Sequence, residues 1–267
     1  MENNFFSQIK KILTANTPTK KIELFRTIYK NFLEEKYSFE SINNIEIFKK
    51  PSYSDFCNIV DQRKVPQRKN LSTKEGQIIL IHAIAHIEYS AIDLALDACY
   101  RFQNMPKEYY KDWMEVADDE IRHFLMLNDL LETYDSHYGD LDVHQNLFEA
   151  SMKTQNLIPR MALIPRYMEA NGLDANAMMI GKLQKIPNTQ KIVKILEIIL
   201  EEEVEHVLKG DKWYKYGCSL KENFSCDYFK IVNSIYPNSF KTNKHINIKA
   251  RKKAGFSDEE IEVLLQQ

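Results

Sequence analysis

The spacing of apolar and polar residues predicts α-helices along most of the chain. Apolar side chains recur every three to four residues, which places them on one face of a helix. With only seven glycines and eight prolines in 267 residues, a turn-rich β fold is disfavoured. We therefore predict an all-α protein, with long helices over residues 72–102, 107–134, 144–171 and 189–216 and a short one over 174–185.

The segments on either side of these helices have different patterns. Residues 3–14 and 17–36 have helical spacing, and the second begins with a threonine and a proline that suit an N-cap and a first turn. Residues 38–71 lack periodicity, so we expect an irregular strap. The chain is thus divided into N-terminal helices with a strap, a four-helix bundle and a C-terminal helical tail, over residues 1–71, 72–217 and 218–267.

Local signals set the helix boundaries. Ser72 and Glu75 form a capping-box pattern at the start of the first long helix. Pro159 and Pro165 kink the third helical region or divide it in two, and Gly172 is predicted to end it. A widened helix that opens a channel to a buried site is the functional interpretation of the two prolines.

Charge and cysteine content narrow the function classes. The 36 basic and 38 acidic residues give a net charge of −2, which disfavours a chain-wide grip on nucleic acid; local basic runs remain at 63–69 and 249–253. The four cysteines lack Cys-x-x-Cys spacing, so we expect reduced thiols in a cytoplasmic protein. The first residues lack a signal-peptide pattern, and histidines interrupt the longest apolar stretch, so no membrane span is predicted.

Two copies of one short motif carry the candidate chemistry. Glu120 and His123 are three residues apart, as are Glu203 and His206, so each pair shares one face of a helix. Each pair also lies on the apolar stripe of a predicted long helix. One Glu-x-x-His is a weak signal, but two of them with two further glutamates form the ligand set of a di-iron or di-manganese bundle.

Two more glutamates have the required placement. The midpoint between Glu88 and Glu120 falls on the predicted turn at residues 104–106, so these two should face each other across a helical hairpin. Glu169 and Glu203 are spaced similarly about the turn before the fourth long helix, although the glycine after Glu169 weakens that match. The predicted metal ligands are Glu88, Glu120, His123, Glu169, Glu203 and His206.

Charge balance supports two metal ions at this site. Four buried glutamates would repel one another, and two divalent cations would neutralise them. Carboxylate and imidazole ligands suit iron or manganese. Each histidine would give its second N–H to an acid, and Asp119 and Glu202 are the candidates because each directly precedes a ligand glutamate.

Other polar residues near the motifs have simpler interpretations. His82 and His86 are one turn apart, and we favour core histidines bonded to a carbonyl or carboxylate over metal ligands. Tyr89 and Tyr167 lie beside predicted ligands, and packing is favoured over a redox role. Alternatives for the ligands are Asp93 or Asp97 in place of Glu88, and Glu202 in place of Glu203.

The ordered ligand set resembles that of the ferritin-like di-iron carboxylate superfamily. Asp119-Glu120-x-Arg122-His123 is similar to the pattern of its oxygen-activating members, such as bacterial monooxygenases and acyl desaturases. The second copy departs from it, with Glu202 for the aspartate and Glu205 for the arginine. More closely, the chain resembles an uncharacterised bacterial family of ferritin-like proteins, often described as related to a tRNA hydroxylase. The matching segments include His86-Ile87-Glu88, Tyr138-Gly139-Asp140, Pro165-Arg166 and Gly172-Leu173-Asp174.

This resemblance implies a ferritin-like four-helix bundle with additional N- and C-terminal helices, and a centre of two iron ions, with manganese as the alternative metal. The expected function is an O2-activating oxidoreductase, a hydroxylase or related oxidase, that acts on an unidentified organic substrate or a modified tRNA nucleoside. The alternative is a non-catalytic metal-binding or iron-handling protein. Expected partners are an electron-donor reductase and a small-molecule or tRNA-borne substrate, with no membrane, and the chain would act as a monomer or homodimer.

Overall fold

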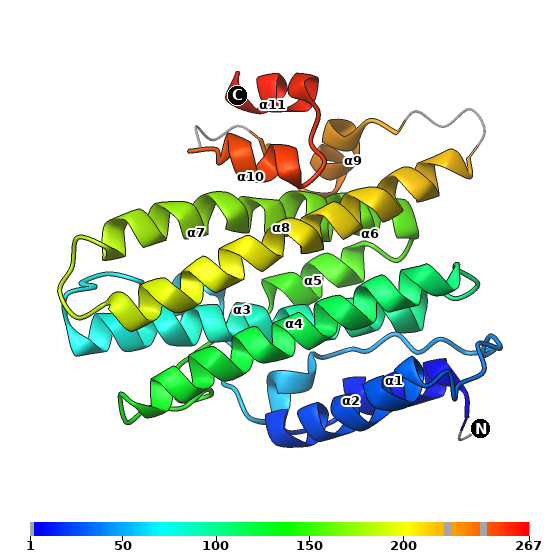
Figure 1. Cartoon of the computed structure of the whole chain (residues 1–267), viewed down its shortest axis with the longest axis horizontal. Helices are drawn as coiled ribbons and strands as arrows, with labels where there is room; N and C mark the ends of the chain where they lie inside the picture. The colour runs from blue at the N-terminus through cyan, green and yellow to red at the C-terminus, as the bar shows by residue number, and fades with distance from the viewer. Residues whose placement is uncertain (1–2, 222–225, 241–244, 267) are drawn as a thin grey trace. The chain divides into compact units, whose positions relative to one another are not determined.

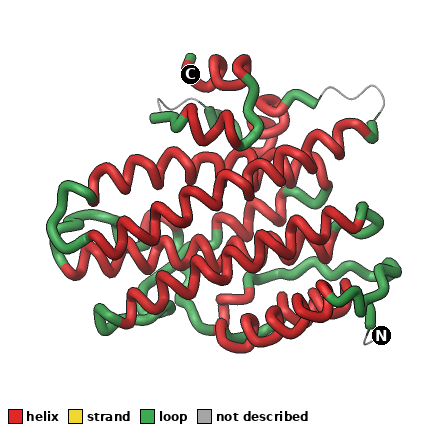
Figure 2. The backbone as a smooth tube through the Cα atoms, in the orientation of Figure 1, coloured by secondary structure: helices red, strands yellow, loops and turns green. Residues whose placement is uncertain are grey.

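A computed structural model describes residues 3–221, 226–240 and 245–266 of the chain (Figures 1 and 2). The fold is all-α, as predicted: the described residues contain no β-strand and only two isolated bridges. The chain divides into two compact units, Met1–Glu149 and Ala150–Gln267, and the boundary falls within α5 (Asn146–Lys153). Each unit is described by itself; the three-part division by sequence stays a prediction.

The first unit begins with the two predicted N-terminal helices, α1 (Phe5–Leu13) and α2 (Pro18–Leu33). The side chain of Asn4 caps α1 and that of Thr17 caps α2, each accepting a backbone N–H of the first turn. Helix α1 packs on both α2 and α3, and its phenylalanines Phe5 and Phe6 are fully buried.

The long hairpin of the first unit consists of α3 (Lys74–Arg101) and α4 (Lys107–Glu132). Helix α3 is long and apolar enough to cross a membrane by length and composition, and 72% of its most apolar stretch of 18 residues is buried inside the fold. Its N-cap is Thr73, whose hydroxyl accepts the Gly76 N–H at 3.1 Å, so the predicted Ser72 cap was wrong by one residue.

The predicted strap between α2 and α3 is irregular, apart from short 3₁₀ turns at Ser52–Asp55 and Gln62–Lys64. Side-chain and backbone hydrogen bonds hold it to the unit. The Ser52 hydroxyl donates to Asp93 of α3 at 2.6 Å, and the Val60 N–H donates to the Val143 carbonyl at 2.8 Å.

The second unit contains α6 (Leu157–Leu163), a π-helical turn (Ile164–Glu169), α7 (Ala170–Leu183) and α8 (Gln190–Ser219). The third helical region is divided, as predicted, but the break lies at residues 154–156, before Pro159. Pro159 lies in the first turn of α6, and Pro165 lies within the π-helical turn. The prediction that Gly172 ends a helix was wrong, because α7 continues through it. A glycine inside a helix costs about 1 kcal/mol relative to alanine, and the packing of α7 along α8 offsets this.

The described residues of the C-terminal tail form three short helices, α9 (Tyr228–Ile235), α10 (Ile248–Lys253) and α11 (Asp258–Leu265), which we call the C-terminal arm. A disulfide joins Cys218, at the end of α8, to Cys226, with the two Cα atoms 6.0 Å apart. The expectation of four reduced thiols was therefore wrong for this pair, because a spacing of eight residues gives no sequence signal. The other two cysteines, Cys57 and Cys99, are free and buried.

Candidate metal centre

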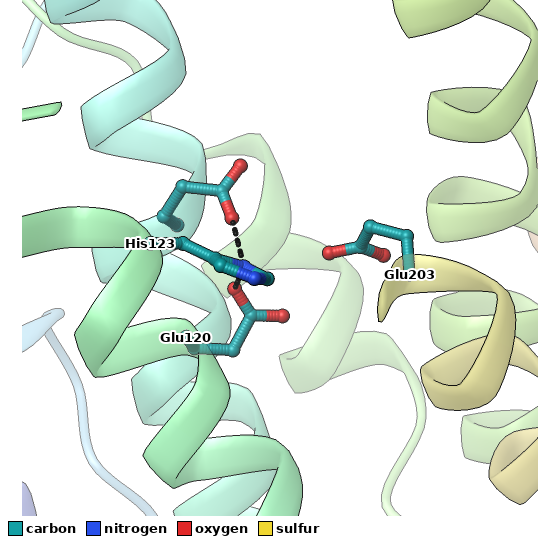
Figure 3. A group of neighbouring side chains, drawn as sticks. Glu120, His123 and Glu203 are labelled. Carbon is teal, nitrogen blue, oxygen red and sulfur yellow. Dashed lines mark hydrogen bonds and ion pairs between the residues drawn. The ribbon is translucent and has the colours of Figure 1, made fainter. Parts of the chain in front are cut away.

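Three of the predicted ligands form a buried group in the first unit. Glu88 lies on α3, and Glu120 and His123 lie on α4, with side chains at most 5% exposed. Their ligand atoms lie within 4.8 Å of one another. His123 Nδ1 is 3.1 Å from Glu88 Oε2 and 3.5 Å from Glu120 Oε2. Figure 3 shows the side chains of Glu120 and His123 directed toward each other from the same helix.

The two buried carboxylates of this group favour a positive charge beside them. Burial and the neighbouring Glu120 charge raise the pKa of Glu88 to about 7. Burial alone would lower the pKa of His123, but hydrogen bonds to Glu120 and Glu88 raise it to about 11. Two buried carboxylates beside one imidazole are therefore a group that could hold a metal ion.

The second Glu-x-x-His pair has the same internal geometry. Glu203 and His206 lie on α8, both buried, and His206 Nδ1 is 3.5 Å from Glu203 Oε1 (Glu203 is labelled in Figure 3). The adjacent Glu202 is only half-buried, which favours Glu203 as the ligand. Glu169, the remaining predicted ligand, is half-buried and ends the π-helical turn.

The alternative first ligands are engaged elsewhere. Asp93 is paired with the fully buried Lys21 of α2 and accepts a hydrogen bond from Ser52. Asp97 receives two hydrogen bonds from Arg101, at 2.7 and 3.0 Å. Among these three acids of α3, Glu88 is the one that faces α4. Asp119, a predicted partner of a ligand histidine, accepts a hydrogen bond from Arg122 at 2.6 Å on a partly exposed side of α4.

His82 and His86 are buried core histidines, as favoured. The predicted bond to a carbonyl is found at His86, whereas His82 bonds backbone N–H groups. His86 Nε2 lies 2.7 Å from the His144 carbonyl, so this nitrogen carries the proton, and Nδ1 accepts a hydrogen bond from the Tyr138 hydroxyl at 2.9 Å. His82 Nε2 accepts the Gly139 N–H at 3.0 Å. Burial lowers the pKa of both histidines to about 4, so both are neutral at physiological pH.

A protein-family model described as "Protein of unknown function (DUF455)" matches residues 14–262. The chain belongs to the DUF455 family. A protein of Haemophilus influenzae (strain ATCC 51907 / DSM 11121 / KW20 / Rd), described as "Uncharacterized protein", is 34% identical over 274 residues, which cover 97% of this chain and 92% of the relative. No solved structure matches the chain significantly. DUF455 membership agrees with the expected uncharacterised family, whereas the ferritin-like superfamily stays an expectation.

Two residues of this DUF455 chain were not singled out from the sequence, although both lie in segments that carried the resemblance. Tyr138 packs against Tyr89 and Phe124, with ring centroids 5.3 and 5.1 Å away, and also bonds His86. Arg166, on the π-helical turn, is 1% exposed. Besides the resemblance, the sequence signal for Arg166 is its position in an otherwise apolar run. An arginine is usually exposed, so its place in such a run is unusual.

Proposed function

We propose that this DUF455 protein is a di-metal carboxylate oxidoreductase. Its ligands would be Glu88, Glu120, His123, Glu169, Glu203 and His206, around two divalent ions, iron before manganese. The observation that carries the proposal is the group of Glu88, Glu120 and His123, with three buried donors within 4.8 Å of one another. Oxygen and imidazole donors suit these metals, so the residues fit the group.

The second unit supports a second ion. Glu203 and His206 repeat the Glu120–His123 separation of 3.5 Å on another long buried helix. Glu169 ends a π-helical turn, a feature that occurs frequently at functional sites in helices. Glu120 and His123 would hold one ion and Glu203 and His206 the other, with Glu88 and Glu169 as the further carboxylate ligands.

Oxidation of an organic substrate is the proposed reaction, with O2 as oxidant. The bound ions would supply the oxygen chemistry. Hydroxylation puts one oxygen atom of O2 into the substrate and reduces the other to water, so it needs an electron donor, and we propose a separate reductase. The chain's own residues hold the ions and keep water out, since the side chains of Glu120 and His123 are at most 1% exposed.

A small-molecule substrate is favoured over a tRNA-borne one. The two basic runs that suggested RNA are partly neutralised within the chain. Arg63 is paired with Asp61 at 2.9 Å, and the buried Arg251 is paired with Asp174 at 2.6 Å. Lys252 also forms an exposed ion pair with Asp258. Lys249 and Lys253 stay exposed, so the second run is weakened as a phosphate-binding surface but not removed.

Metal analysis tests the proposal. We expect the purified protein to bind two Fe(II) or Mn(II) ions per chain, and Glu120→Ala and Glu120→Gln to lose most of this binding. Glu132→Ala, at an exposed position of α4, is the matched control and should bind normally. Iron-loaded protein should then give a transient absorbance on exposure to O2. Unchanged metal content in both Glu120 variants would refute the ligand assignment, and binding without any reaction with O2 would support the iron-handling alternative.

A further inference from the structure

Arg166 is, with Arg160, one of the two arginines of the second unit that are only 1% exposed. Its Nη2 atom donates to both Glu260 oxygens of α11, at 2.9 and 3.0 Å, and its Nε lies 2.9 Å from Asp211 Oδ1 of α8. The rings of Tyr214, Tyr228 and Phe256 surround the guanidinium, with centroids 4.5 to 5.0 Å from Cζ. A buried arginine is stable only with such partners, so removal of one carboxylate leaves an uncompensated charge.

The backbone of the π-helical turn is held by the same part of the chain. The Tyr228 hydroxyl of α9 donates to the Arg166 carbonyl at 2.8 Å, and the Tyr167 hydroxyl donates to the Ser239 carbonyl at 2.8 Å. On the α8 side, a Cβ atom at Gly210 would lie 2.2 Å from Pro165 Cβ, so the turn is seated directly on that helix. The turn therefore has little freedom to move while the C-terminal arm is in place.

A second buried arginine fixes the chain just after Glu169. Arg251 of α10 donates to Asp174 at 2.6 Å and to Asn171 at 3.1 Å, both on α7. Its side chain is 3% exposed and that of Asp174 is 6% exposed. Glu169 thus lies between two arginine–carboxylate clamps, one three residues before it and one five residues after it, and each clamp is completed by a helix of the arm (Figure 1).

From this bracketing we infer that the C-terminal arm orients Glu169, with Arg166 as a positioning residue that acts through the π-helical turn and Glu260 as its anchor. The inference rests on the proposed function, since it takes Glu169 as a metal ligand. The arm would then be part of the metal centre, although none of its residues binds a metal.

The Glu260→Gln variant tests the positioning role without removing the side-chain cap that stabilises α11. Glu260 also accepts the Ser257 N–H at 3.0 Å in a capping box that starts α11. Glutamine serves equally in a capping box, so the variant keeps α11 and removes only the charge that faces Arg166. Glu262→Gln, at an exposed position of the same helix, is the matched control. Arg166→Gln removes the same ion pair from the other side.

The test is a Mn(II) titration of the full chain, followed by electron paramagnetic resonance, which distinguishes a coupled pair of ions from isolated ones. We expect Glu260→Gln and Arg166→Gln to lower the affinity for one of the two ions by about 10- to 100-fold, as for other residues that orient a ligand. Both should show the isolated-ion signal that Glu169→Gln gives. The double variant should bind no more weakly than Arg166→Gln alone, because loss of Arg166 already removes the ion pair with Glu260 as well as the pair with Asp211.

Three results are decisive. The Glu260→Gln and Arg166→Gln variants could give the same titration and the same spectrum as the wild type, while Glu169→Gln differs from it. That result would show that the arm is only structural. An unaltered Glu169→Gln would also overturn the inference, because Glu169 would not be a ligand. If wild-type protein binds no ion and the Glu120 variants match it, the proposed function itself fails, which is a different outcome from either.

Discussion

Protonation of His82 should weaken the first unit in acid, and His82→Gln should remove that effect. His82 is 2% exposed and uses Nε2 to accept N–H groups from Gly139, at 3.0 Å, and Leu141, at 3.4 Å. A protonated ring could accept neither. Burial lowers its pKa from 6.5 to about 4, against a smaller opposing effect of the Asp140 charge.

The sign follows from the depressed pKa of a base. Between pH 6.5 and about 4 the unfolded chain binds a proton at this residue that the folded chain does not, so stability falls as the pH falls. The stabilisation is fully present above pH 6.5. The gap to a pKa of about 4 corresponds to about 3 kcal/mol in full, since one pKa unit is about 1.4 kcal/mol, and to about 2 kcal/mol at pH 5.

Urea unfolding of wild type and His82→Gln at pH 7 and pH 5 measures this term. The glutamine oxygen can still accept the Gly139 N–H but does not titrate. We expect the free energy of unfolding of the wild type to fall by about 2 kcal/mol more than that of the variant between the two pH values. A direct titration of the imidazole by NMR should give a pKa near 4, even with His86 nearby.

Parallel loss of stability in the two proteins would refute this reasoning. So would an NMR pKa of His82 near its ordinary value, because the backbone hydrogen bonds could not then depend on a neutral ring. A wild-type protein whose free energy of unfolding does not fall between pH 7 and pH 5 would also refute it.

Two other predictions concern the second unit. Reduction of the Cys218–Cys226 disulfide, which closes a loop with a sequence separation of 8, should lower the free energy of unfolding of the second unit by about 2–3 kcal/mol. Chemical unfolding with and without a thiol reductant measures this change. The Cys218→Ser, Cys226→Ser double variant should not respond to the reductant. Gly210→Ala should destabilise by about 1–3 kcal/mol, because the new Cβ would overlap Pro165. Gly172→Ala, on α7 with no atom within 4 Å of the new Cβ, should instead stabilise by up to about 1 kcal/mol. Melting shifts of one sign for both alanine variants would contradict the packing argument.

Helical spacing was sufficient to place α3, α4 and α8 and the first group of ligands, but not the region of residues 144–171, which is broken into shorter elements. The turn at residues 104–106 set Glu88 level with Glu120, and the structure brings both to His123. The prediction succeeded because a short turn fixes the register of a helical hairpin. In addition, a buried carboxylate on an apolar stripe must pair with a nearby polar or charged group. Glu203 likewise follows from the stripe of α8, since the neighbouring Glu202 points to a less buried side.

Features that depend on tertiary packing were not accessible from the sequence. Gly172 has the residue type of a helix end but lies inside α7, because packing outweighs its low propensity. The choice between Ser72 and Thr73 as N-cap depends on the tight approach of Gly76 to the backbone of Asn70, where a Cβ would come within 2.2 Å of the carbonyl oxygen. The partners of Arg166 lie 45 and 94 residues further along the chain, at Asp211 and Glu260, so no local pattern could indicate them.

The surroundings of the two glutamates outside the Glu-x-x-His pairs, Glu88 and Glu169, indicate different tasks for the two halves of the proposed centre. Glu88, Glu120 and His123 stand on two continuous α-helices, whose backbone is fixed by its own hydrogen bonds. Glu169 stands instead at the end of a π-helical turn, whose position depends on side chains from the C-terminal arm. A ligand on a regular helix can hold an ion with little adjustment, whereas a ligand on a turn held from outside can be moved by any change in the arm. If the centre changes coordination when substrate or oxidant enters, the change should therefore occur on the side of Glu169.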